Sequence, residues 1–334
     1  MDEPLDALHA PIHNHPYPWY RRQSAIAFDA QLRLWVVAST ALVREALLHP
    51  ALRVRPPGEP VPAALQGRPT GEVFARLVRM NDGAFHARHR PGVAAAAGRW
   101  DDAAAAAAAR AAAEDLRGRI GPDALLTALP VQAMARLLGV RDLDETVRCV
   151  QAFVQGIAGG ASAAALDAAD AAAETLMAQG EAQGLDPARA ANRIALMQQA
   201  LDATAGLIGN AVHLLQRRPD LAGGAMDAVV VEVLRADPPV QNTRRFAAES
   251  LVLGGETIAA GDGLLLLLGP AQLPFGAGPH ACPGERIALR IAAAALEALQ
   301  PLDRWFGPVR GWRPLPNARI PLFSPPPGAA AWSA

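Results

Sequence analysis

The sequence predicts a mainly α-helical fold with small β-sheets, an α+β class. Most of the chain between Gly71 and about Gln300 is helix-prone and rich in alanine, and only short strand-like runs interrupt it. Apolar residues make up 51% and charged residues 19% of the 334 residues, enough for a sizeable core. No linker separates the chain cleanly, so a single domain is expected over residues 1–334.

The first elements are expected to be an arm, a hairpin and a short helix. Residues 1–23 hold four prolines and show no period, which predicts an irregular N-terminal arm. Residues 25–28 and 32–37 are typical of two strands of a hairpin, and a helix is expected from Ser39 to Leu48. The proline-rich stretch over 56–69 is expected to be a loop.

Helices dominate the rest of the chain. Residues 101–116 are nearly polyalanine, which gives a very high helix propensity. Further helices are expected over 128–139, 142–158, 161–179, 187–217, 223–236 and 283–300. Short strands are expected over 245–247, 251–253, 257–259 and 264–268, with two more in the proline-rich tail.

Composition excludes several classes of function. All 31 basic residues are arginine, so no lysine is present to form a Schiff base or a phosphate-binding P-loop. The net charge of −1 gives no global field that would recruit nucleic acid or an anionic membrane. Two cysteines, Cys149 and Cys282, suit a reducing compartment. With no signal peptide and no long apolar run, the expected location is cytoplasmic.

The segment 274–284 carries the clearest chemical signal. Its glycines let the backbone approach a flat ligand closely. Cys282 directly precedes the helix expected from Pro283, and the positive end of a helix dipole favours a thiolate, a soft metal ligand. The alternative is a buried, inert cysteine behind a turn, which the spacing of the segment argues against.

This spacing resembles the haem-binding signature of the cytochrome P450 family, F-x-x-G-x-x-x-C-x-G. The resemblance implies a truncated cytochrome P450 fold, haem b (iron protoporphyrin IX) as cofactor, and Cys282 as the metal ligand, the axial thiolate of the iron. The loop residues expected to lie against the haem are Phe275, Gly276, Gly278, His280 and Gly284.

Other motifs follow the order of that family. Glu232 and Arg235 fit its E-x-x-R motif and lie on one helical face, where the resemblance implies a structural ion pair. His86 and Arg90, four residues apart after Asp82, are similar to the family's donors to a haem propionate. Arg245 and His280 match two further donors, and desolvated propionates need such partners.

The helix over 187–217 resembles the family's oxygen-binding helix, whose acid–alcohol pair relays protons. Asp202 matches the acid, Ala203 replaces the usual threonine, and Thr204 points about 100° further around the helix. Three interpretations remain open. A substrate hydroxyl or an ordered water completes the relay, the oxidation needs less proton control, or the relay and the oxygenase activity are lost.

The chain also departs from the family. It is short, and only residues 269–274 stand where the family has a long meander with an arginine that completes the E-x-x-R pair; Arg244 or the C-terminal tail is the expected substitute. The lid segment 140–186 is small, which predicts an open pocket and a bulky or carrier-tethered substrate. Electrons are expected from a ferredoxin or flavodoxin docking near Arg286 and Arg290.

The function expected from these observations is a haem-thiolate monooxygenase, an oxidoreductase acting on a small apolar or biosynthetic molecule with dioxygen. Two alternatives remain. One is a peroxide-driven or otherwise atypical haem oxidase, favoured by Ala203, and the other is a degenerate haem-binding protein without turnover.

Overall fold

The structure, a computed structural model, describes residues 16–326. Within them the chain forms two compact units. The first unit contains residues 16–58, 206–282 and 306–326, and the second contains 59–205 and 283–305. Helix α9 (Pro187–Arg217) continues from the second unit into the first. The mainly α-helical fold with small sheets is confirmed, whereas the single-domain interpretation stays a prediction.

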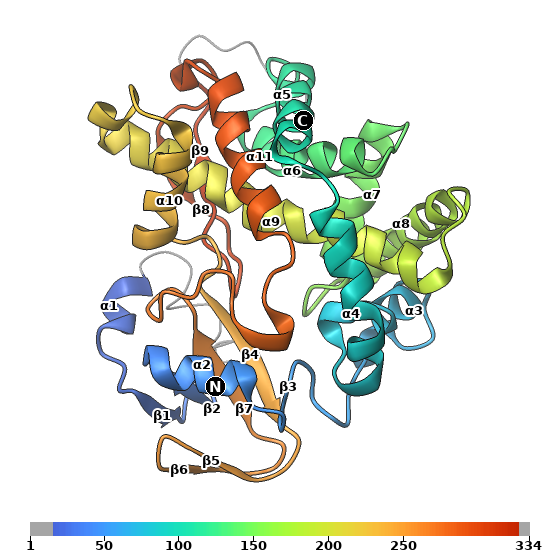
Figure 1. Ribbon diagram of the computed structural model, residues 1–334, viewed down its shortest axis with the longest axis vertical. Coiled ribbons are helices and arrows are strands. Elements are labelled where there is room, and N and C mark those ends of the chain that lie inside the picture. The colour runs from blue at the N-terminus through green and yellow to red at the C-terminus, as the bar shows by residue number, and fades with distance from the viewer. Residues whose placement is uncertain (1–15, 327–334) are drawn as a thin grey trace. The chain divides into compact units, whose positions relative to one another are not determined.

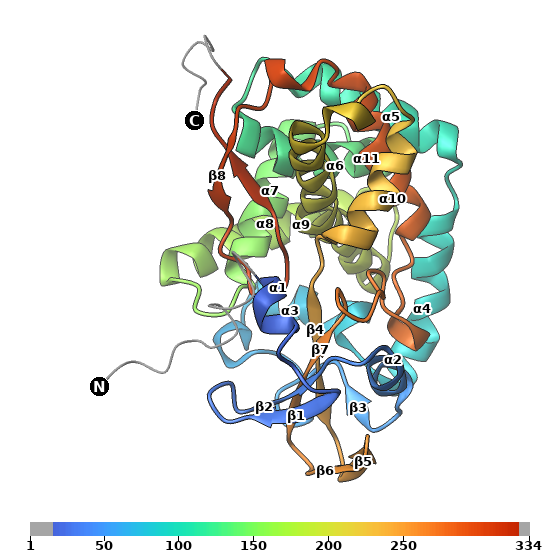
Figure 2. The same cartoon turned by 90° about the vertical axis from the view of Figure 1, so that its left-hand side faces the viewer.

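A five-stranded sheet organises the first unit, with strand order β1-β2-β7-β4-β3 (Figure 2). The strands are β1 (Ile26–Asp29), β2 (Leu34–Val37), β3 (Leu52–Arg53), β4 (Asn242–Ala247) and β7 (Gly263–Leu267). β1 and β2 form the expected antiparallel hairpin, and β2 then pairs in parallel with β7. β4 is antiparallel to both β7 and β3, so the C-terminal half of the chain supplies the centre of the sheet.

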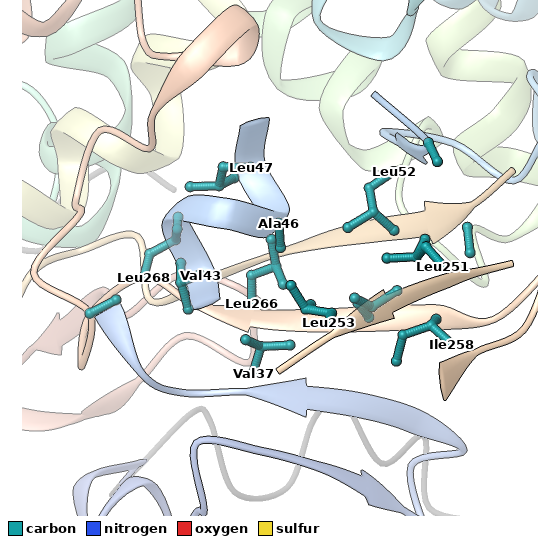
Figure 3. Close-up of a cluster of buried hydrophobic side chains, with 14 of the residues drawn as sticks. Val37, Val43, Ala46, Leu47, Leu52, Leu251, Leu253, Ile258, Leu266 and Leu268 are labelled. Carbon is teal, nitrogen blue, oxygen red and sulfur yellow. The ribbon is translucent and has the colours of Figure 1, made fainter. Parts of the chain in front are cut away.

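Helix α2 (Thr40–Leu48) covers this sheet with an apolar face. Ser39 caps the helix by accepting a hydrogen bond from the backbone N–H of Leu42 at 3.3 Å. Val43, Ala46 and Leu47 point from α2 toward Leu266 of β7 and its neighbours (Figure 3). These side chains are at most 5% exposed, so their burial stabilises the unit by the hydrophobic effect.

The remaining elements of the first unit are short. They are helix α1 (Pro16–Tyr20), helix α10 (Met226–Ala236), the 3-10 turns η3 (Pro219–Leu221) and η4 (Gly278–His280), and the strand pairs β5–β6 (Leu251–Leu253, Glu256–Ile258) and β8–β9 (Val309–Trp312, Pro321–Phe323). The last two pairs confirm the strands expected after residue 250 and in the proline-rich tail.

The second unit is helical. Its helices are α3 (Pro69–Ala75), α4 (Gly83–Gly98), α5 (Asp102–Leu116), α6 (Pro122–Leu137), α7 (Leu143–Gly156), α8 (Ala163–Glu181), α11 (Glu285–Ala298) and the first part of α9, with 3-10 turns η1 (Ala63–Leu65), η2 (Val78–Met80) and η5 (Leu302–Arg304) (Figure 1). No helix among residues 16–326 is long and apolar enough to cross a membrane.

Small residues let these helices approach one another closely. α5 packs between α6 and α11 and buries Ala105, Ala109 and Ala112, so the polyalanine segment forms a packed core helix. Where α7 meets α8, a Cβ atom on Gly156 would lie 2.2 Å from the Cβ of Ala169. Such a distance is impossible without movement, so glycine at position 156 sets the spacing of the two helices.

Three expected boundaries are wrong. Residues 16–20 of the expected irregular arm form α1, and residues 1–15 of that arm lie outside the described residues. α6 begins at Pro122, six residues before position 128, because proline at the first helical position needs no N–H partner and Pro130 is tolerated inside the helix. α11 begins at Glu285 and not at Pro283, because Pro283 and Gly284 form a turn.

Candidate functional site

The loop that follows β7 presents Cys282 at the surface of the first unit. The backbone N–H of Cys282 donates to the carbonyl oxygen of Phe275 at 2.9 Å and so closes the loop, while the cysteine itself is exposed. Gly276 and Gly278 have φ values of 68° and 70°. At Gly278 a Cβ atom would also lie 2.7 Å from the Cδ2 atom of Leu48, so only glycine fits there. An exposed thiol on a closed glycine loop is suited to bind a metal.

The later start of α11 changes one physical argument about Cys282. Cys282 stands three residues before the first residue of that helix, and Gly284 occupies the N-cap position. The effect of a helix dipole falls off within about one turn. Cys282 does not directly precede the helix, so the prediction that a helix N-terminus at this residue favours its thiolate is wrong.

Arg245 and His280 lie in the same unit as Cys282. Arg245, on β4, is 4% exposed, and its Nη1 donates to the carbonyl oxygen of Arg244 at 2.7 Å and to the hydroxyl of Thr243 at 3.4 Å. His280 is half-buried and ends the 3-10 turn η4. The first unit therefore carries Cys282 together with two of the expected propionate donors, Arg245 and His280.

Glu232 and Arg235 form a two-bond ion pair on α10. Arg235 Nη2 donates to Glu232 Oε1 at 2.6 Å, and Arg235 Nε donates to Oε2 at 2.9 Å. The hydrogen bonds from Arg235 lower the pKa of Glu232, and the charge of Arg218 lowers it further. Gln272, in the short segment 269–274, donates to the carbonyl oxygen of Arg235 at 3.3 Å and thereby fastens this segment to the end of α10.

In the second unit, α4 carries His86 and Arg90 one turn apart. His86 is 8% exposed and Arg90 is half-buried. Gly83 begins the helix with a φ of 64°, a conformation that favours glycine. The helical register therefore places both cationic side chains on one face, as the sequence predicts.

Helix α9 carries the expected proton-relay residues. It is an uninterrupted α-helix over its whole length, so no local distortion rotates Thr204 into the direction of Ala203. Thr204 is 2% exposed, whereas Asp202 and Ala203 are half-buried. The side chains of Thr204 and Ala203 therefore lie on different sides of α9 and differ in burial.

The two arginines expected to meet an electron donor are engaged within the second unit. Arg286 on α11 donates to the carboxylate of Asp102 and to the carbonyl oxygen of Trp100. Arg290 Nη2 lies 3.7 Å from the carboxylate of Glu297. Their charges are partly neutralised by these contacts, so their attraction for an acidic partner is weaker than the sequence suggests.

Sequence analysis missed the buried Arg193 and the half-buried Arg79. All three guanidinium nitrogens of Arg193 are buried without a hydrogen-bond partner within residues 16–326, and the Nε atom of Arg79 is in the same condition. Burial lowers the pKa of Arg79 to about 10 and also lowers that of Arg193. No pattern marks them, because an arginine on a helix is normally solvated.

Within the first unit, the residue types present are compatible with a haem. Cys282 offers a soft sulfur ligand at an exposed position, and the buried guanidinium of Arg245 is suited to a carboxylate that leaves water. No group of three or more His, Cys, Asp or Glu residues within the described part of the chain could hold a metal ion by itself.

Comparison with known proteins gives one consistent answer. No model of a protein family matches the chain. Cytochrome P450 133B1 of Xylella fastidiosa is 33% identical over 135 residues, which are 32% of this chain and 34% of that protein. The mycinamicin VIII C21 methyl hydroxylase of Micromonospora griseorubida is 34% identical over 22% of this chain and 24% of its own. The matched segment thus spans about a third or less of these curated relatives.

Solved structures match over nearly the whole chain. P450BioI, in complex with an acyl carrier protein ligated to hexadec-9Z-enoic acid, matches with a TM-score of 0.76 and 22% identity over 92% of this chain and 96% of its own. CalO2 matches with a TM-score of 0.73 and 22% identity over 93% and 96%. Fold and matched sequence agree: about a third of the chain or less is similar in sequence to curated cytochromes P450, and the chain has the fold of the solved bacterial cytochromes P450.

Proposed function

We propose that the protein is a haem-thiolate monooxygenase that uses dioxygen and electrons from a redox partner to oxidise a small apolar or biosynthetic molecule. The observation that carries this proposal is the exposed thiol of Cys282, presented by a closed loop of positive-φ glycines in a chain with the cytochrome P450 fold. The chain is an enzyme on this proposal, and its cofactor is haem b.

Each candidate residue has a distinct task. Cys282 holds the iron through its sulfur, and Phe275, Gly276, Gly278 and Gly284 shape the loop around that ligand. His86, Arg90, Arg245 and His280 donate to the propionates. When bound, the haem supplies the redox chemistry that activates dioxygen. Glu232 and Arg235 support the fold and take no part in the reaction.

Proton delivery depends on residues of α9. Asp202 is half-buried, so its carboxyl group can exchange protons with water. Ala203 has no hydroxyl to pass a proton on, and the hydroxyl of Thr204 is buried on another side of the helix. A water molecule or a substrate hydroxyl beside Ala203 therefore completes the path from Asp202, since proton transfer needs donor and acceptor within hydrogen-bond reach.

A spectrum of the haem-loaded protein tests the proposal. Reduced with dithionite and exposed to carbon monoxide, the protein is expected to give the red-shifted Soret band of thiolate ligation. Cys282→Ser abolishes this band, because a serine hydroxyl is not a soft anionic ligand. Cys149→Ser is the matched control and keeps it. A band of the imidazole-ligated type in the unmodified protein, or an unchanged band in Cys282→Ser, contradicts the proposal.

A second candidate function is a peroxide-driven oxidase. It is favoured because α9 is an undistorted helix with no hydroxyl at position 203. Peroxide brings both electrons and both protons with its two oxygen atoms, so it relaxes the need for the relay that Ala203 interrupts. Turnover with NAD(P)H, ferredoxin reductase and ferredoxin is compared with turnover on hydrogen peroxide alone. Faster turnover with peroxide supports this candidate, and no product from either supports a haem-binding protein without turnover.

The finer assignments also belong to this proposal. A ferredoxin or flavodoxin is the expected electron donor, as the resemblance to the cytochrome P450 family implies. A bulky or carrier-tethered substrate suits the small segment 140–186, which folds as α7, the α7–α8 connection and α8. The structural neighbour P450BioI was solved with an acyl carrier protein, which supports testing carrier-bound substrates. A cytoplasmic location agrees with the cysteine content.

A further inference from the structure

Arg193 is the least compensated charge on α9. The residue is 4% exposed, and none of its three guanidinium nitrogens has a hydrogen-bond partner or an ion pair among residues 16–326. A guanidinium stays protonated in proteins, so it cannot escape the cost of burial by losing its charge. A buried cation without an anion is strongly unfavourable, which points to an anion that binds there.

The surroundings of Arg193 are held firmly. The side-chain amide of its neighbour Asn192 donates to the carbonyl oxygen of Arg76 at 2.9 Å and accepts from the backbone N–H of Val78 at 3.0 Å. These bonds fasten the 3-10 turn η2 to the first turns of α9. Arg79 directly follows Val78, and its buried Nε atom also has no partner in the described part of the chain.

Two cationic side chains are therefore attached next to one rigid anchor, Arg193 beside Asn192 and Arg79 beside Val78. Both arginines belong to the second unit. An anion bound there would satisfy the unpartnered nitrogens of Arg193. A carboxylate or phosphate also matches the planar fork of a guanidinium, which binds such groups through two parallel hydrogen bonds.

Beyond Arg193, one face of α9 is only partly buried. Leu196, Gln199, Ala200 and Ala203 are half-buried and recur at helical spacing. Ala203 follows Arg193 by ten residues, about 15 Å along the helix axis at 1.5 Å per residue. Arg193 thus lies at one end of this face of α9, and Ala203, in the candidate proton path, lies at the other end.

We propose that Arg193 binds the carboxylate or phosphate end of the substrate, whose apolar body lies along this face of α9. The proposal rests on the proposed function, because it assigns a specificity-determining residue to that reaction. It identifies the substrate class as an amphiphilic anion, and the spacing along α9 selects which carbon is oxidised.

Calorimetric titration of the haem-loaded full-length protein tests this. The probes are decanoate, decyl phosphate, decanol and inorganic phosphate, and the two anionic amphiphiles are expected to bind at least about 10-fold more tightly than decanol. Arg193→Met removes this preference and leaves the affinity for decanol unchanged. Arg189→Met is the matched control: it lies on the same helix, its side chain is 78% exposed and pairs with Asp186, and the preference is kept.

A second readout separates binding from a structural role. Without anions, Arg193→Met is expected to unfold at the same or a higher temperature, because it removes an uncompensated buried charge. Decanoate then raises the unfolding temperature of the unmodified protein but not that of the variant. Should the methionine variant fail to fold, Arg193→Gln and Arg193→Lys answer the same question, since only lysine keeps the charge.

The outcomes are distinct. Equal affinity for decanoate, decyl phosphate and decanol overturns the proposal, as does a preference that survives in Arg193→Met. An anion preference seen only before haem is added means that the cofactor's own carboxylates meet Arg193, which also overturns it. Whichever of decanoate and decyl phosphate binds more tightly shows whether the site takes a carboxylate or a phosphate. If the anion preference is absent but Arg193→Met still gives the thiolate-type carbon monoxide spectrum, the proposal for Arg193 has failed and the proposed function has not.

Discussion

At the scale of single residues, Ala203 stands where the oxygen-binding helix that α9 resembles has a threonine. Its methyl group lies half-buried on a regular helix, beside an acid and ahead of a buried threonine. Ala203→Thr is expected to raise the share of electrons that ends in product, by up to about 10-fold, because it supplies the missing hydroxyl for proton transfer. Product formed per NAD(P)H consumed measures this share.

The matched control for that change is Ala188→Thr, which adds the same hydroxyl in the first turn of the same helix, outside the proposed substrate face. It is expected to leave coupling unchanged. If Ala203→Thr also has no effect, a water or the substrate already performs the transfer, and the residue at position 203 does not limit the reaction.

A second residue-scale prediction concerns the pair Arg319 and Asp237. Arg319 is 6% exposed, its Nε lies 2.9 and 3.1 Å from the two carboxylate oxygens of Asp237, and its guanidinium carbon lies 3.3 Å from the ring centre of Trp312. Asp237→Ala removes the carboxylate that accepts from this buried cation. We expect a loss of about 3–5 kcal/mol in the free energy of unfolding, measured in urea.

The comparison variant is Asp220→Ala. Its partner Arg218 is 57% exposed and Asp220 is 61% exposed, so water replaces the lost interaction and the expected cost is below about 1 kcal/mol. Equal costs for the two variants would show that burial of Arg319 does not govern the strength of its ion pair.

At the scale of elements, Asp170 joins α8 to the start of α3. Its carboxylate accepts from the backbone N–H of Thr70 at 3.0 Å, from the Thr70 hydroxyl at 2.7 Å and from Arg68 Nε at 2.8 Å. Burial raises the pKa of Asp170, but these hydrogen bonds and the charge of Arg68 outweigh it and hold the pKa below the ordinary value of 3.8.

A lowered carboxyl pKa stabilises the folded state above pH 3.8, and this contribution is lost as the pH falls through the folded-state pKa. Asp170→Asn is therefore expected to cost about 1–3 kcal/mol at pH 7 and progressively less in acid, measured as unfolding free energy at pH 7, 5 and 3. Asp167→Asn, on a side chain that is 75% exposed, is the control with little change at any pH. A cost for Asp170→Asn that is independent of pH contradicts the assignment.

The elements also show what sequence patterns can predict. The hairpin, the helix capped by Ser39 and the strand over 251–253 lie where local propensity and turn residues place them. The start of α6 was missed because Pro130 lies inside the helix, although Gly121 and Pro122 are typical of a helix beginning. Local sequence patterns predict local geometry. They fail where tertiary packing stabilises a local exception, such as a proline inside a helix.

The same limit applies to the candidate site. The loop around Cys282 carries its own signal, since glycines with positive φ and a fixed spacing are local features. The burial of Arg193 is not local: it depends on how η2 is fastened to α9 through Asn192. No spacing within 187–217 distinguishes this arginine from the solvated Arg189, so only the structure reveals it.

At the scale of the whole molecule, α9 is the element that links the two units. The helix passes from the second unit to the first between Ala205 and Gly206 without a break in its hydrogen-bonded ladder. Within the first unit, Gly206 lies so close to its neighbours that a Cβ atom would be 2.6 Å from the Cβ of Pro239. Neither part of α9 can therefore unfold without freeing backbone groups of the other part.

This continuity predicts one cooperative unfolding transition, as expected for a single domain. Hydrogen exchange in rising urea is expected to give the same opening free energy, within about 1 kcal/mol, for backbone amides over 194–205 and over 206–214. The hairpin β5–β6, whose Val252 is 63% exposed, serves as the control that opens locally at lower cost. Two separate opening steps on either side of position 205 would instead mean that the units are independent domains, because a helix shared by one cooperative core cannot lose half of its hydrogen bonds alone.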